Sequence, residues 1–168
     1  MEQFDVLDIH GNPSGLTKPK GAPLTDGQYY LGVHVYIHNA TGQFLLQRRA
    51  LDKPFLPGGW DTLLEHVIAG ETSVQAAARG VDEELGLSVA ESQLRFAERF
   101  IWESFHHLVD VYFLQMEFDP AELRLQATEV IAAKLVCRKE MLRFVANMHY
   151  RPAEYRALLT SAIEHLSL

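Results

Sequence analysis

Residues 63–89 read L-L-E-H-V-I-A-G-E-T-S-V-Q-A-A-A-R-G-V-D-E-E-L-G-L-S-V and contain the start, body and end of one amphipathic helix. Thr72 and Gln75 predict a capping box, in which the hydroxyl accepts from a first-turn amide and the glutamine reaches back. Gly86 supplies the left-handed residue that ends a helix. The sequence therefore predicts a helix from about Ser73 to Leu85, whose apolar positions recur at three- and four-residue intervals: Val74, Ala77, Ala78, Val81 and Leu85.

The opposite side of this helix is polar. Residues three and four apart stack along one helix face, so Arg79, Gly80, Glu83 and Glu84 are expected to lie away from the apolar stripe. In an arbitrary helix, two glutamates one turn beyond an arginine usually form nothing more than a solvated, charged face.

The spacing of these residues resembles the Nudix box, the signature of the Nudix hydrolase superfamily. Its pattern is G-x5-E-x7-R-E-U-x-E-E-x-G-U, where U is aliphatic. Two positions depart from it, since the first glycine falls on Glu65 and the glutamate after the arginine falls on Gly80. Both departures are on the metal-binding side of the motif. The matching positions are Glu71, Arg79, Val81, Glu83, Glu84, Gly86 and Leu87.

The resemblance implies an enzyme that cleaves a diphosphate linked to another group, with Mg²⁺ or Mn²⁺ as cofactor. Magnesium needs several hard oxygen ligands, and clustered carboxylates on one helix face suit it. By the resemblance, Glu83 and Glu84 are metal ligands and catalytic residues. Glu71, Arg79 and Gly86 are structural, with Glu71 and Arg79 expected to pair and hold the box loop against the helix.

Gly80 stands where most family members have a glutamate that serves as a metal ligand or base. A glycine in an exposed helix face also costs about 1 kcal/mol relative to alanine. One hypothesis is that Glu65, expected in the loop beside the metal site, supplies the lost carboxylate as a third metal ligand and catalytic group. The alternative is that Glu65 points to water and the site has decayed.

Other segments of the chain complete a single expected domain, residues 1–168, with the α/β (α+β) Nudix fold of a mixed sheet sandwiched between helices. An N-terminal hairpin is predicted for residues 4–17, with glycine, asparagine and proline at its turn. Further elements are a central hairpin of Tyr29–His38 and Phe44–Gln47, strands at Leu94–Glu103, Leu108–Glu117 and Val130–Val136, a short helix at Lys139–Met148 and a C-terminal helix over residues 152–166.

Two segments outside the box resemble the isopentenyl-diphosphate-isomerase-like branch of the superfamily. They are D-V-L-D-x-x-G-x-P-x-G from Asp5 and K-x-x-x-P-G-x-W from Lys53, so the likeness covers roughly residues 4–145. His66 falls where an isomerase has a metal-binding histidine. Tyr30 replaces the partner histidine and Leu64 the isomerase cysteine, so isomerase activity is not expected.

Several residues outside the box are candidates for lesser roles. Arg48, Arg49 and Lys53 could grip a substrate phosphate, although paired surface cations are commonly just solvated. Glu129 and Val130 resemble the E-V pair before the last strand of many Nudix proteins, where the glutamate can approach the metal or anchor the loop, and the anchor is favoured here. His106 and His107 lie at a predicted hairpin tip, where surface histidine is the default and at most one of them should face a pocket.

Composition limits the partners. The net charge is −7, which argues against a nucleic-acid surface, and no apolar run is long enough for a membrane span. A single cysteine and a start without a secretion signal indicate a cytoplasmic protein. Whether the protein forms a homodimer is left open by the sequence.

Two functions from different classes remain. The first is a magnesium-dependent hydrolase of a nucleoside diphosphate derivative or similar small diphosphate compound. The second is a Nudix-fold binding module that keeps the pocket but has lost hydrolysis, for which the two altered box positions are the direct argument.

Overall fold

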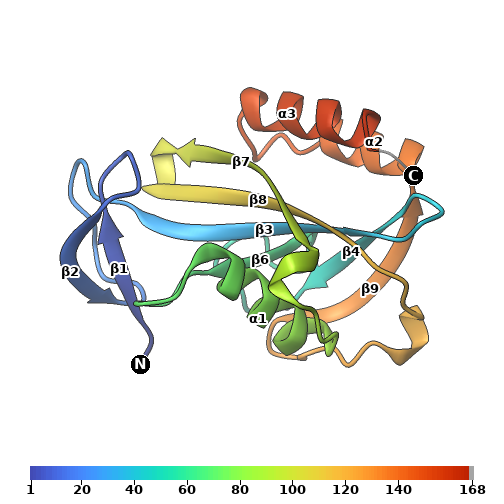
Figure 1. The fold of residues 1–168 in the computed structure, drawn as a ribbon, viewed down its shortest axis with the longest axis horizontal. Coiled ribbons are helices and arrows are strands. Elements are labelled where there is room, and N and C mark those ends of the chain that lie inside the picture. Colours follow the sequence, from blue (N-terminus) through green and yellow to red (C-terminus); the bar gives the residue numbers. More distant parts are fainter. Residues whose placement is uncertain (167–168) are drawn as a thin grey trace.

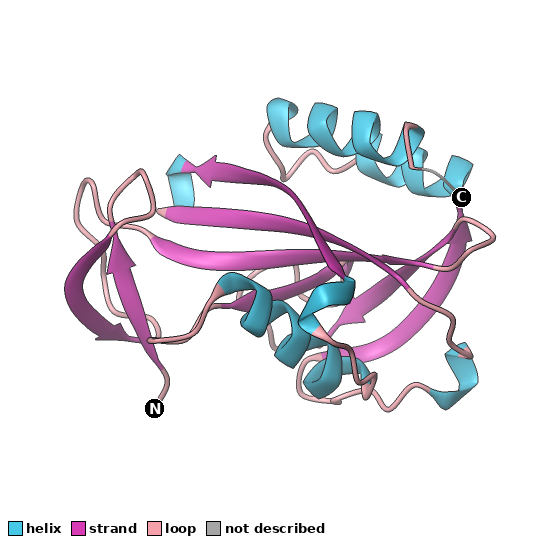
Figure 2. Ribbon diagram, viewed as in Figure 1, coloured by secondary structure: helices cyan, strands magenta, loops and turns pink. Residues whose placement is uncertain are grey.

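A mixed seven-stranded sheet with helices on both faces forms the body of the molecule (Figures 1 and 2). The structure is a computed structural model and describes residues 1–166. The fold class predicted from the sequence is confirmed. No helix in this range is both long and apolar enough to cross a membrane.

Two long parallel strands make the centre of the sheet. β3 (Tyr30–His38) pairs with β8 (His107–Gln115) along its whole length, and β7 (Leu94–Trp102) continues the sheet beyond β8. β6 (Leu63–His66) pairs antiparallel with the other side of β3.

The predicted central hairpin is only partly correct. β4 (Gln43–Arg49) pairs with β3 at a single position, His38 opposite Phe44. Beyond that point the two strands diverge, because β6 takes the place beside β3 while β4 pairs with β9 (Val130–Cys137) and β5 (Trp60–Asp61).

The helices cover the two apolar faces of this sheet. α1 (Ser73–Leu85) packs on the face that includes Val33 and Val35, and α2 (Arg138–Ala146) and α3 (Ala153–Glu164) pack on the opposite face. Because side chains alternate along a strand, β3 contributes to both layers. Three 3₁₀ turns lie in the connections: Glu91–Gln93, Glu103–Phe105 and Pro120–Glu122.

The N-terminal hairpin forms a separate two-stranded sheet. It consists of β1 (Gln3–Leu7) and β2 (Pro13–Pro19), and Phe4 and Val6 pack with Tyr30 at the start of β3. The hairpin therefore lies against the same end of the sheet as the beginning of β3.

A buried ion pair joins the chain before α3 to the middle of the sheet. Arg151 Nη2 lies 2.8 Å from Asp61 Oδ2, and both side chains are almost fully buried. The Arg151 guanidinium also lies 4.8 Å from the ring centroid of Trp102 and contacts His34 Nε2 at 3.2 Å. The cation is thus enclosed by an acid and by aromatic groups.

The ends of α1 are as the sequence predicts. Thr72 and Gln75 form the reciprocal capping box, and Gly86 closes the helix in the left-handed region with φ of 69°. A Cβ added at Gly86 would come within 2.8 Å of Arg124 Cβ. The helix end thus requires glycine for its backbone angle and for the neighbouring segment.

Replacing Gly86 by valine is expected to lower the free energy of unfolding by at least about 1 kcal/mol, because a β-branched residue is strained at positive φ. Gly70 is a matched control, since its φ is also positive, at 82°, but nothing lies within 4 Å of an added Cβ. Denaturant titrations of both valine variants should show the larger loss for Gly86→Val. Equal losses would mean that the contact with Arg124 contributes nothing.

Candidate active site

The polar face of α1 is not uniformly exposed. Gly80 and Glu84 are buried, whereas Glu83 is exposed, so the expectation of an exposed helix face at Gly80 was wrong. The reason is that α1 contacts the sheet through a wider surface than the apolar stripe alone. Gly80 faces β6 and Glu84 faces β4.

Gly80 lies directly against Glu65. Glu65 is on strand β6 rather than in a loop, which corrects the sequence-based expectation. A Cβ added at Gly80 would lie 3.1 Å from Glu65 Cβ, 3.3 Å from Glu65 Cγ and 3.2 Å from Leu63 Cδ2. The two residues that depart from the box pattern therefore share one space, and Glu65 occupies it.

Arg79 contacts three of the carboxylates, those of Glu65, Glu71 and Glu83. Its Nε and Nη2 donate to the two oxygens of Glu71, each at 3.0 Å, and Nη2 also donates to the His66 carbonyl at 2.8 Å. Its Nη1 lies 3.3 Å from Glu65 Oε2 and 3.3 Å from Glu83 Oε2. The bidentate pair with Glu71 fixes the guanidinium plane, while the longer contacts bring Glu65 and Glu83 to one nitrogen.

Glu84 is held differently. Its side chain is 3% exposed and Oε2 accepts a hydrogen bond of 2.6 Å from Gln47 Nε2 on β4. Burial raises the pKa of Glu84 to about 8, with the nearby charges of Glu65 and Glu129 acting in the same direction. Burial likewise raises the pKa of Glu65. Burial and the neighbouring acids thus disfavour the charged forms of both side chains unless a cation is present.

This raised pKa predicts how stability depends on pH. Between the ordinary value of 4.5 and about 8, the folded chain keeps a proton on Glu84 that the unfolded chain releases. The free energy of unfolding without metal should therefore fall as pH rises through this window. Denaturant titrations at several pH values should show a shallower fall in Glu84→Gln, which cannot ionise; an identical slope would contradict the burial effect.

The three predicted phosphate-gripping cations lie around the loop between β4 and β5. Arg48 Nε donates to the Gly58 carbonyl and Arg49 Nε to the Phe55 carbonyl, both at 2.9 Å. Lys53 forms an ion pair with Glu129. Arg48 and Arg49 thus use one donor each to hold the loop, and Lys53 together with Glu129 ties this loop to the segment before β9.

The oxygen donors suit a hard divalent cation, although they are not yet arranged as a cage. Within residues 1–166, no three acidic, histidine or cysteine side chains converge closely enough to enclose an ion. Glu84 is nevertheless a buried carboxylate beside other acids, and its one side-chain hydrogen bond in the described range comes from a neutral amide. A cation there would offset the repulsion among these acids.

Two histidines contact each other, His66 at the end of β6 and His107 at the start of β8. His107 Nδ1 donates to the Phe105 carbonyl at 2.6 Å, so its Nε2 accepts from His66 Nε2, 3.1 Å away. Both side chains are partly buried, and this desolvation lowers their pKa values, to about 3 for His66. His106 and His107 are thus half-buried, so the expected surface placement is only partly correct. His106 and His107 also line one pocket of about 330 Å³, against the expectation that at most one would face a pocket.

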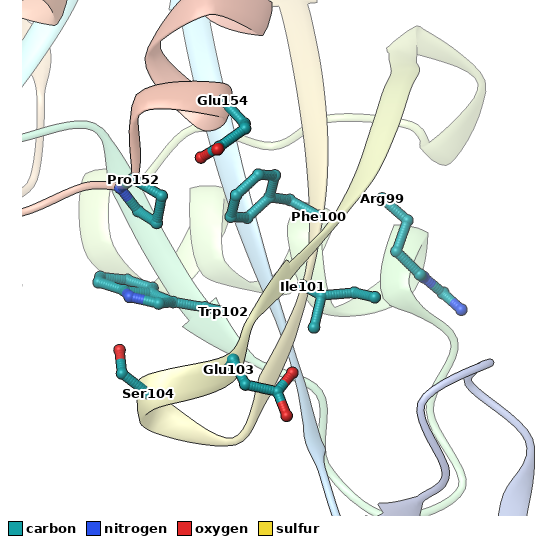
Figure 3. A pocket seen from close by; sticks show the side chains of 8 residues that line it. All are labelled: Arg99, Phe100, Ile101, Trp102, Glu103, Ser104, Pro152 and Glu154. Carbon is teal, nitrogen blue, oxygen red and sulfur yellow. The ribbon is translucent and has the colours of Figure 1, made fainter.

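A second, larger hollow of about 570 Å³ lies along β7 and the start of α3 (Figure 3). Its lining residues include Phe100, Trp102 and Glu154, and none of the box carboxylates. Its size alone therefore does not make it the reaction centre.

One residue of the site, Gln47, was missed in the sequence. It follows the apolar run Phe44–Leu46 on β4 and points to the same face as Leu45, so an amide interrupts a buried strand. That interruption was the available signal.

Comparison with known proteins identifies the family of the chain. The family model described as NUDIX domain matches residues 28–158. An uncharacterized Nudix hydrolase of Listeria monocytogenes is 35% identical over 142 residues, which cover 84% of this chain and 83% of that protein. Another from Pseudomonas aeruginosa is 33% identical, with 90% and 88% covered. An isopentenyl-diphosphate Delta-isomerase of Corynebacterium diphtheriae is 38% identical, but over only 52% of this chain and 49% of the isomerase.

Solved structures show the same fold. DR0079 from Deinococcus radiodurans superposes with a TM-score of 0.73 at 18% identity, covering 97% of this chain and 98% of that one. The MutT protein from Methanosarcina mazei Go1 gives a TM-score of 0.60 at 25% identity, with 81% and 93% covered.

The chain belongs to the Nudix family. Its Nudix hydrolase relatives identify it as a hydrolase, and enzymes of this family generally depend on a divalent metal and act on small molecules.

Proposed function

We propose that this hydrolase cleaves the diphosphate linkage of a nucleoside diphosphate derivative or a similar small compound, with Mg²⁺ or Mn²⁺ as cofactor. The observation that carries the proposal is the contact between the two altered box positions, in which Glu65 fills the space beside Gly80. In this proposal the carboxylate lost from the helix is replaced by one from the neighbouring strand. A decayed site gives no reason for the two changes to meet.

In this proposal Glu83, Glu84 and Glu65 hold the metal. The bound cation would supply charge neutralisation at the phosphate oxygens and activation of the attacking water. Arg79 orients Glu65 and Glu83 through its Nη1 while Glu71 fixes the guanidinium. The longer 3.3 Å contacts are the ones that must yield when the carboxylates turn toward an ion.

Arg48 and Arg49 are proposed to bind the diphosphate, with Lys53 holding the loop through Glu129. Hydrogen bonds to charged groups contribute about 1.5–3 kcal/mol, so Arg49→Ala should raise KM about tenfold or more. Arg143→Ala, an exposed arginine on α2, is the control and should leave KM unchanged. Steady-state kinetics on any hydrolysed substrate would measure this, and equal KM values in the two variants would remove Arg49 from the substrate site.

The function is tested by a hydrolysis screen over a panel of nucleoside diphosphate derivatives and other diphosphate compounds, with Mg²⁺ or Mn²⁺. We expect release of phosphate products that depends on the metal and stops with a chelator. The second candidate is a binding module without hydrolysis. It is favoured by the contacts of Arg79 with Glu65 and Glu83, because both carboxylates would have to leave the guanidinium before they could bind a metal. Binding of panel compounds without turnover under either metal would support that module and overturn the proposed hydrolysis.

A further inference from the structure

Gln47 is a polar side chain in a place that favours an apolar one. It is 2% exposed and lies on β4 between β5 and β9, opposite Asp61 on one side and Ala133 on the other. The preceding residue on the same face is Leu45, which belongs to the core beneath α1. Burying an amide costs free energy unless its polar atoms are paired.

The amide is only partly paired. Nε2 donates to Glu84 Oε2 at 2.6 Å, whereas Oε1 is buried and has no hydrogen-bond partner among residues 1–166. A leucine would fill such a site without an unpaired carbonyl. The short bond to Glu84 is the contact that accounts for a glutamine here.

Glu84 differs from the other acids of the site in its partner. Glu65, Glu71 and Glu83 each contact the Arg79 guanidinium, whose positive charge partly neutralises them. Glu84 receives a neutral donor instead. Gln47 therefore fixes one oxygen of Glu84 without bringing a positive charge of its own, and the other oxygen, Oε1, remains for a cation.

We propose that Gln47 is a positioning residue that presents Glu84 to the metal. It acts through Glu84 and does not itself touch the ion. This inference rests on the proposed function, because it assumes that Glu84 is a ligand.

The test measures binding of Mn²⁺ alone to the full chain, by the loss of the free-ion electron paramagnetic resonance signal. Removing an outer-shell partner of a metal ligand typically costs about 10- to 100-fold in metal affinity, and we expect a loss in this range for Gln47→Met. Leu45→Met is the matched control, with a similar side chain on the same strand and face, and should keep the wild-type Kd. Gln47→Leu also lacks the donor and suits the apolar pattern of β4, so it decides the test if the methionine variant does not fold.

A double-mutant cycle separates positioning from a general packing effect. If Gln47 acts through Glu84, then Gln47→Met should weaken Mn²⁺ binding in the wild type but add little in the Glu84→Gln background. A merely structural role would give equal losses in both backgrounds and would overturn the inference.

The remaining outcomes distinguish this inference from the proposed function. Wild-type Kd in Gln47→Met and Gln47→Leu, with weakened binding in Glu84→Gln, would refute Gln47 and leave Glu84 as a ligand. Wild-type Kd in Glu84→Gln would refute the metal assignment and the inference with it. Absence of Mn²⁺ binding in the unaltered chain would overturn both.

Discussion

Glu65→Gly is expected to reduce metal-dependent hydrolysis by at least about a hundredfold, because the carboxylate beside Gly80 would be lost from the metal site. Gly80→Glu alone should also lose activity, since its side chain would meet Glu65 and Leu63 within 3.3 Å of its Cβ. The double variant Glu65→Gly with Gly80→Glu removes that contact and restores the family pattern. It should therefore be more active than either single variant.

Gly80→Ala is the control for packing in this experiment. Because Gly80 is buried against β6, the stability gain expected for replacing an exposed helical glycine should not appear, and a small loss is expected instead. In the Glu65→Gly background, Gly80→Ala should lower the free energy of unfolding by less, because the Glu65 side chain that the added methyl group meets is absent. Unchanged activity in Glu65→Gly would show that Glu65 is not part of the site, and a double variant no better than the singles would contradict the exchange.

Glu83→Gln and Glu84→Gln are each expected to abolish detectable hydrolysis, but their effects on stability should differ. The Glu83 side chain is 49% exposed, so its replacement should change the free energy of unfolding by less than about 0.5 kcal/mol. The same small effect is not expected for Glu84, because this side chain is buried. Glu84→Gln removes a buried acid, so without metal it should be at least as stable as the wild type near neutral pH.

Asp82→Asn is the matched control for these variants, since Asp82 is an exposed acid on the same helix and outside the box pattern. It should keep wild-type turnover and wild-type Mn²⁺ affinity. Full activity in both glutamate variants would refute their assignment as ligands.

The extent of α1 was predictable because capping and helix termination are local. Thr72, Gln75 and Gly86 act within a few residues of themselves, and the predicted helix has the observed bounds. The burial of Gly80 and Glu84 was not predictable from helix periodicity. It depends on where β6 and β4 lie, which is set by strand pairing far along the chain.

The divergence of β3 and β4 is a second feature that local sequence could not predict. The turn near His38 and Phe44 predicts a hairpin correctly at that point, but local sequence does not reveal that β6 and β9 replace the partners beyond it. This divergence brings Gln47 opposite α1. The box spacing could identify the helix acids, whereas the contacts of Glu65 with Gly80 and of Gln47 with Glu84 required the structure.

The pair of Asp61 and Arg151 limits where the chain can be shortened. A chain that stopped before Arg151 would retain the whole Nudix box, yet it would lose the cation that pairs with Asp61 together with α3, which covers this face of the sheet. Losing one partner of a buried pair typically costs about 3–5 kcal/mol, a large part of the stability of an ordinary domain. The segment just before α3 is thus an electrostatic requirement of the strand that leads into the site, and the motif cannot be treated as a separable folding unit.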